Sequence, residues 1–384
     1  MAHQWIWQLK TWPHFAWDEE VLAAPLAAAR LAQGRLLGLG RMLDGSLSGE
    51  ALGDVLVEEG LTTSAIEGEL LNPDQVRSSV ARHLGLPTAG LPAPGRDVDG
   101  LITVLLDAVR RHEEPLNLDR LLGWHASLFP GGRSGLHRIK TGTLRGGAPM
   151  QVVSGPQGRE KVHFEAPPRL GLEAEVERFL AWFNGWKAEE GGRLLDGLLR
   201  AGIAHFWFVT LHPFEDGNGR LARAITDLAL AQDERRTLRL FSMSSQILLE
   251  REAYYTILEK EQTSGHGLDV TAWLAWFLTQ LAAACGRAEH TVERTLYKAR
   301  FWLRFRELPL SERQRKVLNR LLDAGAGGFE GGLTARKYMG MTKASKATAT
   351  RDLADLAQVG CLVPTGKGGR SAAYGLPELG DSHP

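Results

Sequence analysis

The stretch His212–Arg223, His-Pro-Phe-Glu-Asp-Gly-Asn-Gly-Arg-Leu-Ala-Arg, constrains the fold of this chain more than any other. Proline disfavours helical geometry in the residue before it, so an incoming helix should end at His212. Gly217 and Gly219 permit positive φ and a bare backbone, so that amide N–H groups can converge on an anion. Apolar residues then recur with helical spacing, so a second helix should point its N-terminus at the same place. The pattern predicts a phosphate-binding loop with a histidine base at its edge.

These twelve residues resemble the signature of the Fic family, His-Pro-Phe-x-Asp/Glu-Gly-Asn-Gly-Arg-x-x-Arg, and every fixed position is filled. The resemblance implies a mainly α fold, with a Fic-type helical core and a β-hairpin flap. It also implies the family's usual reaction, the transfer of AMP from ATP to a Ser, Thr or Tyr hydroxyl of a protein, including self-modification. ATP and Mg²⁺ are therefore the expected cofactors.

The resemblance gives each polar residue of the signature a role. His212 would be the general base that takes the proton of the target hydroxyl. Asp216 would hold one Mg²⁺ ion. The nucleotide phosphates would lie against the backbone and the two arginines, which gives the set Gly217, Asn218, Gly219, Arg220 and Arg223. A zinc site fits this stretch less well, because no second histidine or cysteine lies at ligand spacing. A Walker-type phosphate loop is also disfavoured, because the sequence Gly-x-x-x-x-Gly-Lys-Ser/Thr does not occur.

Two tyrosines after the signature helix are candidates for the nucleotide-base pocket. Tyr254 or Tyr255 could stack on adenine, although either can equally belong to the core. His205 lies in the helix before the signature, on a face with aromatic neighbours, and is expected to be a core histidine with satisfied hydrogen bonds. Nothing in the sequence selects adenine over uracil or guanine.

Glu67 lies at the end of a predicted helix over Ala51–Gly68. A negative charge in the last turn is disfavoured by the helix dipole, so this carboxylate should face water or a cation. The run Thr63-x-x-x-Glu67-Gly68 is similar to the Fic inhibitory motif, Ser/Thr-x-x-x-Glu-Gly/Asn. The resemblance implies that Glu67 pairs with a signature arginine and blocks placement of the γ-phosphate. A second interpretation is removal of AMP from modified proteins, with Glu67 positioning a water molecule.

The chain is predicted to have three domains. Residues 1–95 would form an N-terminal region with the inhibitory helix, residues 96–300 the Fic catalytic core and residues 301–384 a winged-helix domain. Strand-like periodicity at Met150–Val153 and Val162–Glu165 predicts a hairpin before the signature, which resembles the Fic flap that registers a target segment. The Trp-rich start of the chain is expected to lie as an arm against the body.

The last part of the chain is basic, in contrast to the balance of 45 Lys and Arg with 45 Asp and Glu over the whole sequence. Three predicted helices followed by a glycine-tipped hairpin resemble a winged helix. Lys343, Lys346 and Arg351 would line its third helix, and Lys367 and Arg370 its wing, which suits DNA contacts. The alternatives are protein contacts or dimerisation through this domain. A nucleotide-responsive DNA-binding regulator is thus a third candidate function.

Other features place the chain among cytoplasmic proteins. It has two cysteines, Cys285 and Cys361, too few for a disulfide framework. Its first residues do not read as a signal peptide. The most apolar run, Leu268–Cys285, is interrupted by polar residues and is expected to be a buried helix, with no membrane as partner. Resemblance to the family implies a homodimer.

Overall fold

The computed structural model describes residues 4–43, 45–88, 90–155, 159, 161–185, 195–237, 239–325, 328–365 and 372–379. The chain divides into two compact units, of which the first comprises Met1–Gly40 and Asp44–Ala288. The second comprises Arg41–Leu43 and Glu289–Pro384. The division into domains 1–95, 96–300 and 301–384 remains a prediction.

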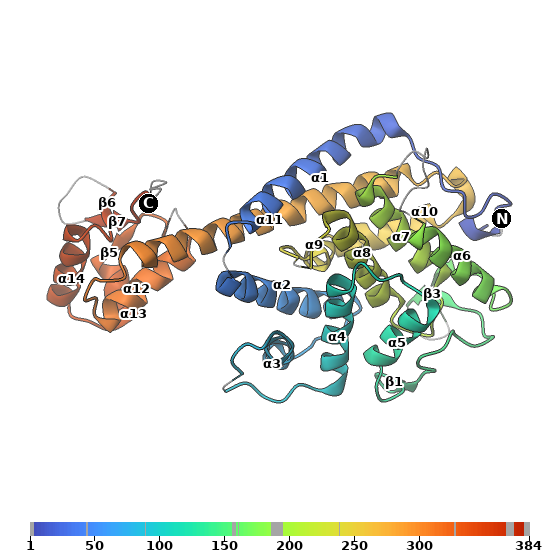
Figure 1. Ribbon diagram of the computed structural model, residues 1–384, viewed down its shortest axis with the longest axis horizontal. Coiled ribbons are helices and arrows are strands. Elements are labelled where there is room, and N and C mark those ends of the chain that lie inside the picture. Colours follow the sequence, from blue (N-terminus) through green and yellow to red (C-terminus); the bar gives the residue numbers. More distant parts are fainter. Residues whose placement is uncertain are drawn as a thin grey trace. The chain divides into compact units, whose positions relative to one another are not determined.

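The first unit is mainly helical, as the sequence predicts (Figure 1). Two short 3₁₀ helices, Ile6–Gln8 and Ser264–His266, accompany its α-helices. The α-helices are α1 (Glu19–Gly40), α2 (Gly45–Ile66), α3 (Pro73–Leu84), α4 (Arg96–Arg110), α5 (Leu118–Leu128), α6 (Leu172–Asn184), α7 (Gly197–Leu211), α8 (Asn218–Glu234), α9 (Met243–Leu249) and α10 (Arg251–Glu261), and α11 (Thr271–Arg304) begins in this unit.

Helices α7 and α8 form the centre of the first unit. Residues 198–211 of α7 are all buried, as expected for a helix that is apolar on every side. Helix α8 packs against α7, α4 and α2, and α6 covers another side of α7. The signature loop joins these two buried helices, so its position is fixed by the core of the unit.

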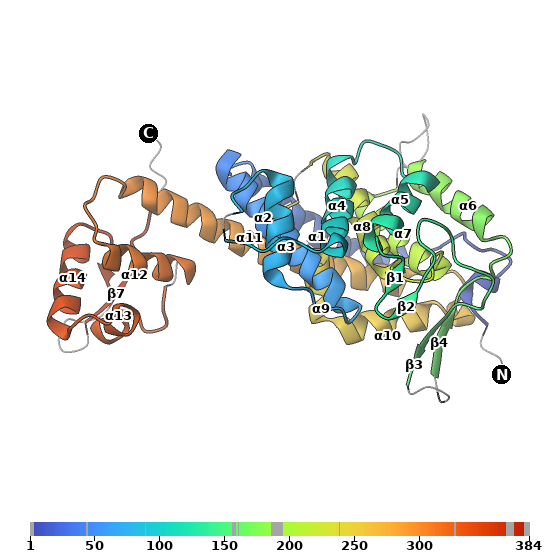
Figure 2. The ribbon, with the colours of Figure 1, turned by 90° about the horizontal axis from the view of Figure 1, so that it is seen from below.

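Two small hairpins lie between α5 and α6. Strands β1 (Arg133–Ser134) and β2 (His137–Arg138) pair antiparallel, as do β3 (Gln151–Ser154) and β4 (Lys161–Glu165). The second pair is the predicted hairpin, and it projects from the body in Figure 2. Part of its turn, residues 156–158, lies outside the described residues.

The Trp-rich start of the chain packs against the β3–β4 hairpin, as the sequence predicts for an arm. The indole of Trp5 meets the ring of Phe164 edge to face, with 5.4 Å between centroids. The indole N–H of Trp7 donates to the carbonyl of Glu165 at 2.7 Å. The base of the hairpin is thereby held by a segment far away in sequence.

The second unit continues from α11 with further helices and a small sheet. Strand β7 (Ala373–Gly375) pairs antiparallel with both of its neighbours, β5 (Leu333–Thr334) and β6 (Val363–Pro364), so the strand order is β5-β7-β6. Strand β5 was not predicted from the sequence. The elements are α12 (Glu312–Asp323), β5 (Leu333–Thr334), α13 (Ala335–Thr342), α14 (Lys346–Gln358), β6 (Val363–Pro364) and β7 (Ala373–Gly375), with an apolar core beneath them.

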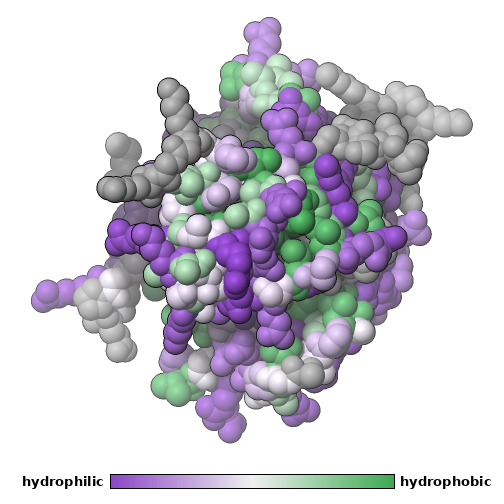
Figure 3. Space-filling view, turned by 90° about the vertical axis from the view of Figure 1, so that its left-hand side faces the viewer, coloured by the Kyte–Doolittle hydropathy of each residue, from purple (hydrophilic) through white to green (hydrophobic). Residues whose placement is uncertain are grey.

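The surface is largely hydrophilic in the view of Figure 3, with apolar atoms visible between polar side chains. Among the helices of the described residues, none has the length and hydropathy that a membrane span requires.

Candidate active site

His212 lies at the junction between α7 and the signature loop. It adopts the left-handed conformation, with φ 47° and ψ 57°, and its N–H donates to the carbonyl of Phe208 at 3.1 Å. Its ring Nδ1 lies 3.2 Å from the carbonyl oxygen of Val209. Because a carbonyl only accepts, Nδ1 carries a proton in this hydrogen bond, so that in the neutral imidazole Nε2 keeps its lone pair. The helix ends at the predicted place and presents a neutral imidazole with a free basic nitrogen.

The environment of His212 favours the neutral imidazole. Burial is the main cause that lowers the pKa of His212, and the nearby Arg145 lowers it further. The hydrogen bond to Val209 and the charges of Glu67 and Asp216 act in the opposite direction. The net effect leaves His212 unprotonated to lower pH than an exposed histidine.

The signature loop is closed by the side chain of Asn218. Its Oδ1 accepts from the N–H of Phe214 and its Nδ2 donates to the carbonyl of the same residue, both at 2.9 Å. The ring of Phe214 is fully buried and stacks on His125, with 4.1 Å between centroids. The Asn218 amide therefore shapes the loop, and its backbone is the part left for an anion. His125 was missed in the sequence because no motif marks it.

Arg145 is a second residue of the site for which no role was predicted from the sequence. Its guanidinium is buried and donates to the carbonyls of His212, at 2.8 Å, and Pro167. Its own N–H donates to the carbonyl of Pro213 at 2.9 Å. Arg145 thus connects the segment before α6 to the start of the signature loop and holds the backbone of His212.

Helix α8 begins directly after Gly217, which has φ 81°. A Cβ at this position would lie 2.8 Å from the ring of Phe129, so a side chain is excluded by both conformation and space. The first-turn N–H groups of α8 point towards the loop, where the helix dipole favours an anion. The helix begins where the sequence predicts, while phosphate binding at its N-terminus remains a prediction.

Asp216 is the residue predicted to hold Mg²⁺. Its carboxylate accepts from the hydroxyl of Ser134 on β1 and from the N–H of Gly217 at 2.5 Å. Clusters of three or more His, Cys, Asp or Glu side chains suited to a metal do not occur in the described part of the chain. A single carboxylate fits Mg²⁺ that keeps several waters and shares substrate phosphates.

Glu67 and Arg223 form an ion pair, with 2.7 Å between Oε1 and Nη2. Arg223 is 2% exposed and also donates to the hydroxyl of Thr63 at 2.7 Å and to its carbonyl at 2.8 Å. A Cβ built on Gly219 would lie 2.1 Å from Glu67 Oε1, so the carboxylate rests on the first turn of α8. Glu67 thus lies where the dipole of α8 attracts an anion. The structure brings together the two residues that the sequence paired.

Arg220 pairs with Glu69, a residue that the sequence analysis did not select. The distance from Arg220 Nη1 to Glu69 Oε2 is 2.9 Å. The Arg220 guanidinium also lies over the ring of Phe129, 4.9 Å from its centroid. Both signature arginines are therefore held by carboxylates that come from the end of α2.

The two tyrosines lie beside this cluster. Tyr254 is 2% exposed, and its hydroxyl lies 2.8 Å from His205 Nε2. His205 Nδ1 lies 2.9 Å from the hydroxyl of Thr226, so His205 is the satisfied core histidine that was predicted. The hydroxyl of Tyr255 donates to the carbonyl of Ile66 at 3.2 Å. Contact of either tyrosine with a nucleotide base remains a prediction.

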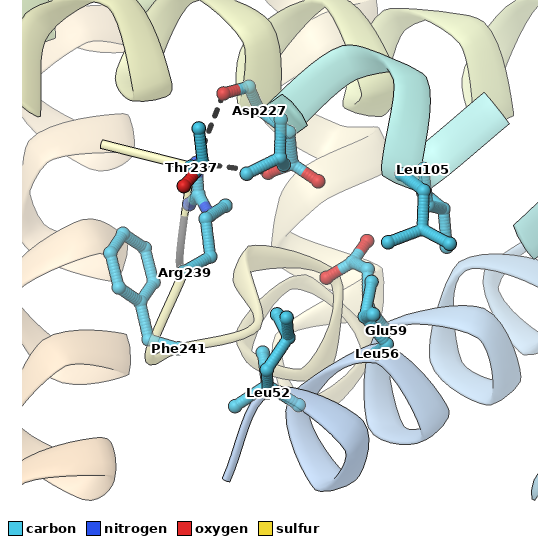
Figure 4. A pocket seen from close by; sticks show the side chains of 11 residues that line it. Leu52, Leu56, Glu59, Leu105, Asp227, Thr237, Arg239 and Phe241 are labelled. Carbon is cyan, nitrogen blue, oxygen red and sulfur yellow. Dashed lines mark hydrogen bonds and ion pairs between the residues drawn. The ribbon is translucent and has the colours of Figure 1, made fainter. Parts of the chain in front are cut away.

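A buried polar cluster lies further along the contact between α2 and α8, beside a cavity with room for about one water molecule (Figure 4). Arg239 Nη1 pairs with Asp227 at 3.3 Å, and burial raises the pKa of Asp227 to about 7. Glu59 accepts from the hydroxyl of Ser242 at 2.6 Å and from the N–H of Ser244 at 3.2 Å. Polar contacts therefore hold α2 at Glu59 as well as at the Glu67–Arg223 ion pair that follows its last residue.

Comparison with known proteins agrees with this architecture. Residues 115–230 match the model of the Fic/DOC family, and residues 5–86 match a model described as a domain of unknown function (DUF4172). The chain therefore contains a region of the Fic/DOC family, which is similar in sequence to Fic adenylyltransferases.

Two curated relatives are nematode proteins. The chain is 44% identical over 172 residues to "Protein adenylyltransferase fic-1" of Caenorhabditis elegans, which covers 44% of this chain and 30% of that protein. It is 29% identical over 169 residues to the protein of the same name from Caenorhabditis briggsae, with the same shares. The chain thus spans about a third of the length of the curated relatives it matches.

Solved structures share the fold. A Fic family protein from Desulfovibrio desulfuricans G20 superposes with a TM-score of 0.53 at 19% identity, covering 94% of this chain and 97% of that one. A Fic domain containing signaling protein from Bacteroides thetaiotaomicron gives 0.53 at 17% identity, covering 71% and 97%. The predicted fold class, a mainly helical Fic-type fold, is confirmed.

Proposed function

We propose that this protein is a protein adenylyltransferase that transfers AMP from ATP to a Ser, Thr or Tyr hydroxyl of a protein and is inhibited by Glu67. The observation that carries the proposal is the neutral His212, with Nε2 unprotonated, in the loop that leads into the N-terminus of α8. A base and an anion-binding helix end are the equipment that phosphoryl-group chemistry needs. Arg220, in the first turn of α8, and Arg223, in its second turn, supply positive charge.

In this reaction Nε2 of His212 takes the proton of the target hydroxyl as its oxygen attacks the α-phosphorus of ATP. The bond from that phosphorus to the bridging oxygen breaks, and diphosphate leaves with its electron pair. The first-turn N–H groups of α8 and the two arginines stabilise the phosphate charge. Asp216 would hold a Mg²⁺ ion, which would supply positive charge to offset that of the phosphates.

Mass spectrometry of the purified protein and candidate targets after incubation with ATP and Mg²⁺ tests the reaction class. A gain of one AMP supports the proposal, whereas a gain of one phosphate, or no change in a Glu67→Gly variant that binds ATP, contradicts it. Supplying an AMP-modified protein and following AMP release distinguishes the reverse activity, in which Glu67 would position water.

The pH dependence of the reaction follows from the lowered pKa of His212. A base whose folded pKa lies below the ordinary value of 6.5 stays neutral as the pH falls past that value. We expect kcat/KM for AMP transfer by a Glu67→Gly variant to fall only when the pH drops below 6.5. Removal of Glu67 also removes a charge that raises this pKa, which moves the acid limb further down. An acid limb centred above pH 6.5 would contradict the assignment of His212 as base.

We also propose that the second unit binds duplex DNA. The order α12, β5, α13, α14, β6, β7 supports a winged-helix arrangement in which α14 would enter the major groove. Lys343, Lys346 and Arg351 are exposed at or near α14, while Lys367 and Arg370 lie outside the described residues. Basic side chains on an exposed helix suit phosphate contacts.

A gel-shift titration with salt tests this second proposal. Binding should weaken with rising salt, and Lys346→Ala with Arg351→Ala should reduce both the affinity and the salt slope. An unchanged duplex mobility at low salt would instead favour a role of this unit in protein contacts.

A further inference from the structure

The end of α2 presents two carboxylates to the signature helix. The N–H groups of Glu67 and Glu69 both donate to the carbonyl of Ser64 at 3.0 Å, and the N–H of Gly68 donates to Ala65 at 3.0 Å. Gly68 has φ 84°, a left-handed conformation that reverses the chain at the helix end. Because of this turn, the carboxylates of Glu67 and Glu69 both reach α8, although only one residue separates them.

The turn is fixed from the opposite side by α10. The carbonyl of Ile66 accepts from Arg251 Nε at 2.9 Å and from the hydroxyl of Tyr255 at 3.2 Å. Arg251 also lies over the ring of Tyr255, 5.1 Å from its centroid. A cation at the C-terminus of a helix stabilises its last carbonyls. The carboxylates that follow Ile66 are therefore held in place by contacts of their own backbone.

Arg220 is the partner of the second carboxylate. Its side chain is 9% exposed, and its Nη1 is 2.9 Å from Glu69 Oε2. Its Nε is buried and finds no hydrogen-bond acceptor among the described residues. Arg223 likewise has a buried Nη1 with no acceptor in the described chain. Each arginine thus donates one N–H to a carboxylate of this segment and has another N–H without an acceptor, as expected for groups that can bind a larger anion.

We propose that Glu69 is a second inhibitory carboxylate, which withholds Arg220 from a nucleoside polyphosphate while Glu67 withholds Arg223. This inference rests on the proposed function, because it assigns the regulation of the same site. An incoming ATP must then displace two carboxylates, and removal of Glu67 alone frees only one arginine.

The two pairs differ in strength. Glu67 keeps 30% of its side chain exposed against an arginine that is 2% exposed, whereas Glu69 keeps 44% against one that is 9% exposed. Water screens the more exposed pair more strongly. We therefore expect Glu69 to contribute less than Glu67, as a supplement to the main inhibitory contact.

Binding titrations in a His212→Ala background test the proposal without turnover. ATP with Mg²⁺ and AMP are the two probes, and the variants are Glu69→Gln, Glu67→Gly and the two combined. We expect Glu69→Gln to tighten ATP binding about three- to tenfold, both with Glu67 present and in the Glu67→Gly variant. AMP binding should stay unchanged, because AMP lacks the polyphosphate. Glu252→Gln, an exposed glutamate in the first turn of α10, is the matched control and should change neither.

The outcomes separate the two proposals. If Glu67→Gly binds ATP and Glu69→Gln leaves that affinity unchanged or weaker, the second inhibitory carboxylate is refuted while the proposed function stands. If none of the variants binds ATP, the proposed function fails and this inference fails with it. Circular dichroism checks that each variant is folded, which the exposure of Glu69 favours.

Discussion

Replacing His212 with alanine is expected to lower the rate of AMP transfer by about 10²–10⁴-fold, the usual contribution of a general base. Nδ1 of the His212 ring donates to Val209 and burial lowers the pKa of the ring, so Nε2 is the nitrogen that can accept a proton. ATP binding should change little, since the groups that would meet the phosphates belong to α8 and its arginines. The rate is best measured with labelled ATP in a Glu67→Gly background, where the signal is largest.

A second substitution distinguishes loss of the base from loss of the loop. His212 has φ 47°, and asparagine tolerates this left-handed conformation better than most residues. His212→Asn should therefore retain the loop and the melting temperature while losing transfer as alanine does. His290→Ala, at a side chain that is 84% exposed, is the matched control and should leave the rate unchanged. Transfer by His212→Asn within a few-fold of its parent would overturn the assignment of the base.

The sequence predicted those parts of the site that depend on local backbone chemistry. Proline after His212 and glycine at position 217 determine where one helix ends and the next begins, and both boundaries are confirmed. The pairing of Glu67 with Arg223 was also predicted, but through the family resemblance. Spacing alone could not connect two residues 156 positions apart.

The contacts missed from the sequence are those in which one element supports another. Arg145 donates to the backbone of His212, and His125 stacks on Phe214, yet the sequence patterns in which they lie predict neither contact. Glu69 follows the inhibitory motif and would be read as a solvated charge without the turn at Gly68. Which faces of distant helices meet is decided by packing of the whole unit, so such partners emerge only in three dimensions.

Replacing Glu67 with glycine is expected to raise AMP transfer, including self-modification, by about tenfold or more. The substitution removes the carboxylate that pairs with Arg223 and rests against Gly219, so the N-terminus of α8 becomes open to an anion. The gain corresponds to at least ~1.4 kcal/mol, a reasonable value for a charge-assisted pair with a nearly buried arginine. Incubation of wild type, Glu67→Gly and Glu67→Gln with labelled ATP measures the gain. Equal labelling by all three proteins would contradict inhibition by Glu67.

The same substitution should lower the stability of the first unit. Breaking a fully buried ion pair costs about 3–5 kcal/mol, but Glu67 is 30% exposed and Arg223 keeps two bonds to Thr63, so a smaller loss of about 1–3 kcal/mol is expected. Thermal melting should therefore show a lower transition in the more active variant. A general loosening of the fold lowers both stability and activity. Opposite changes in the two measurements would thus identify Glu67 as a contact that stabilises the protein in a less active form.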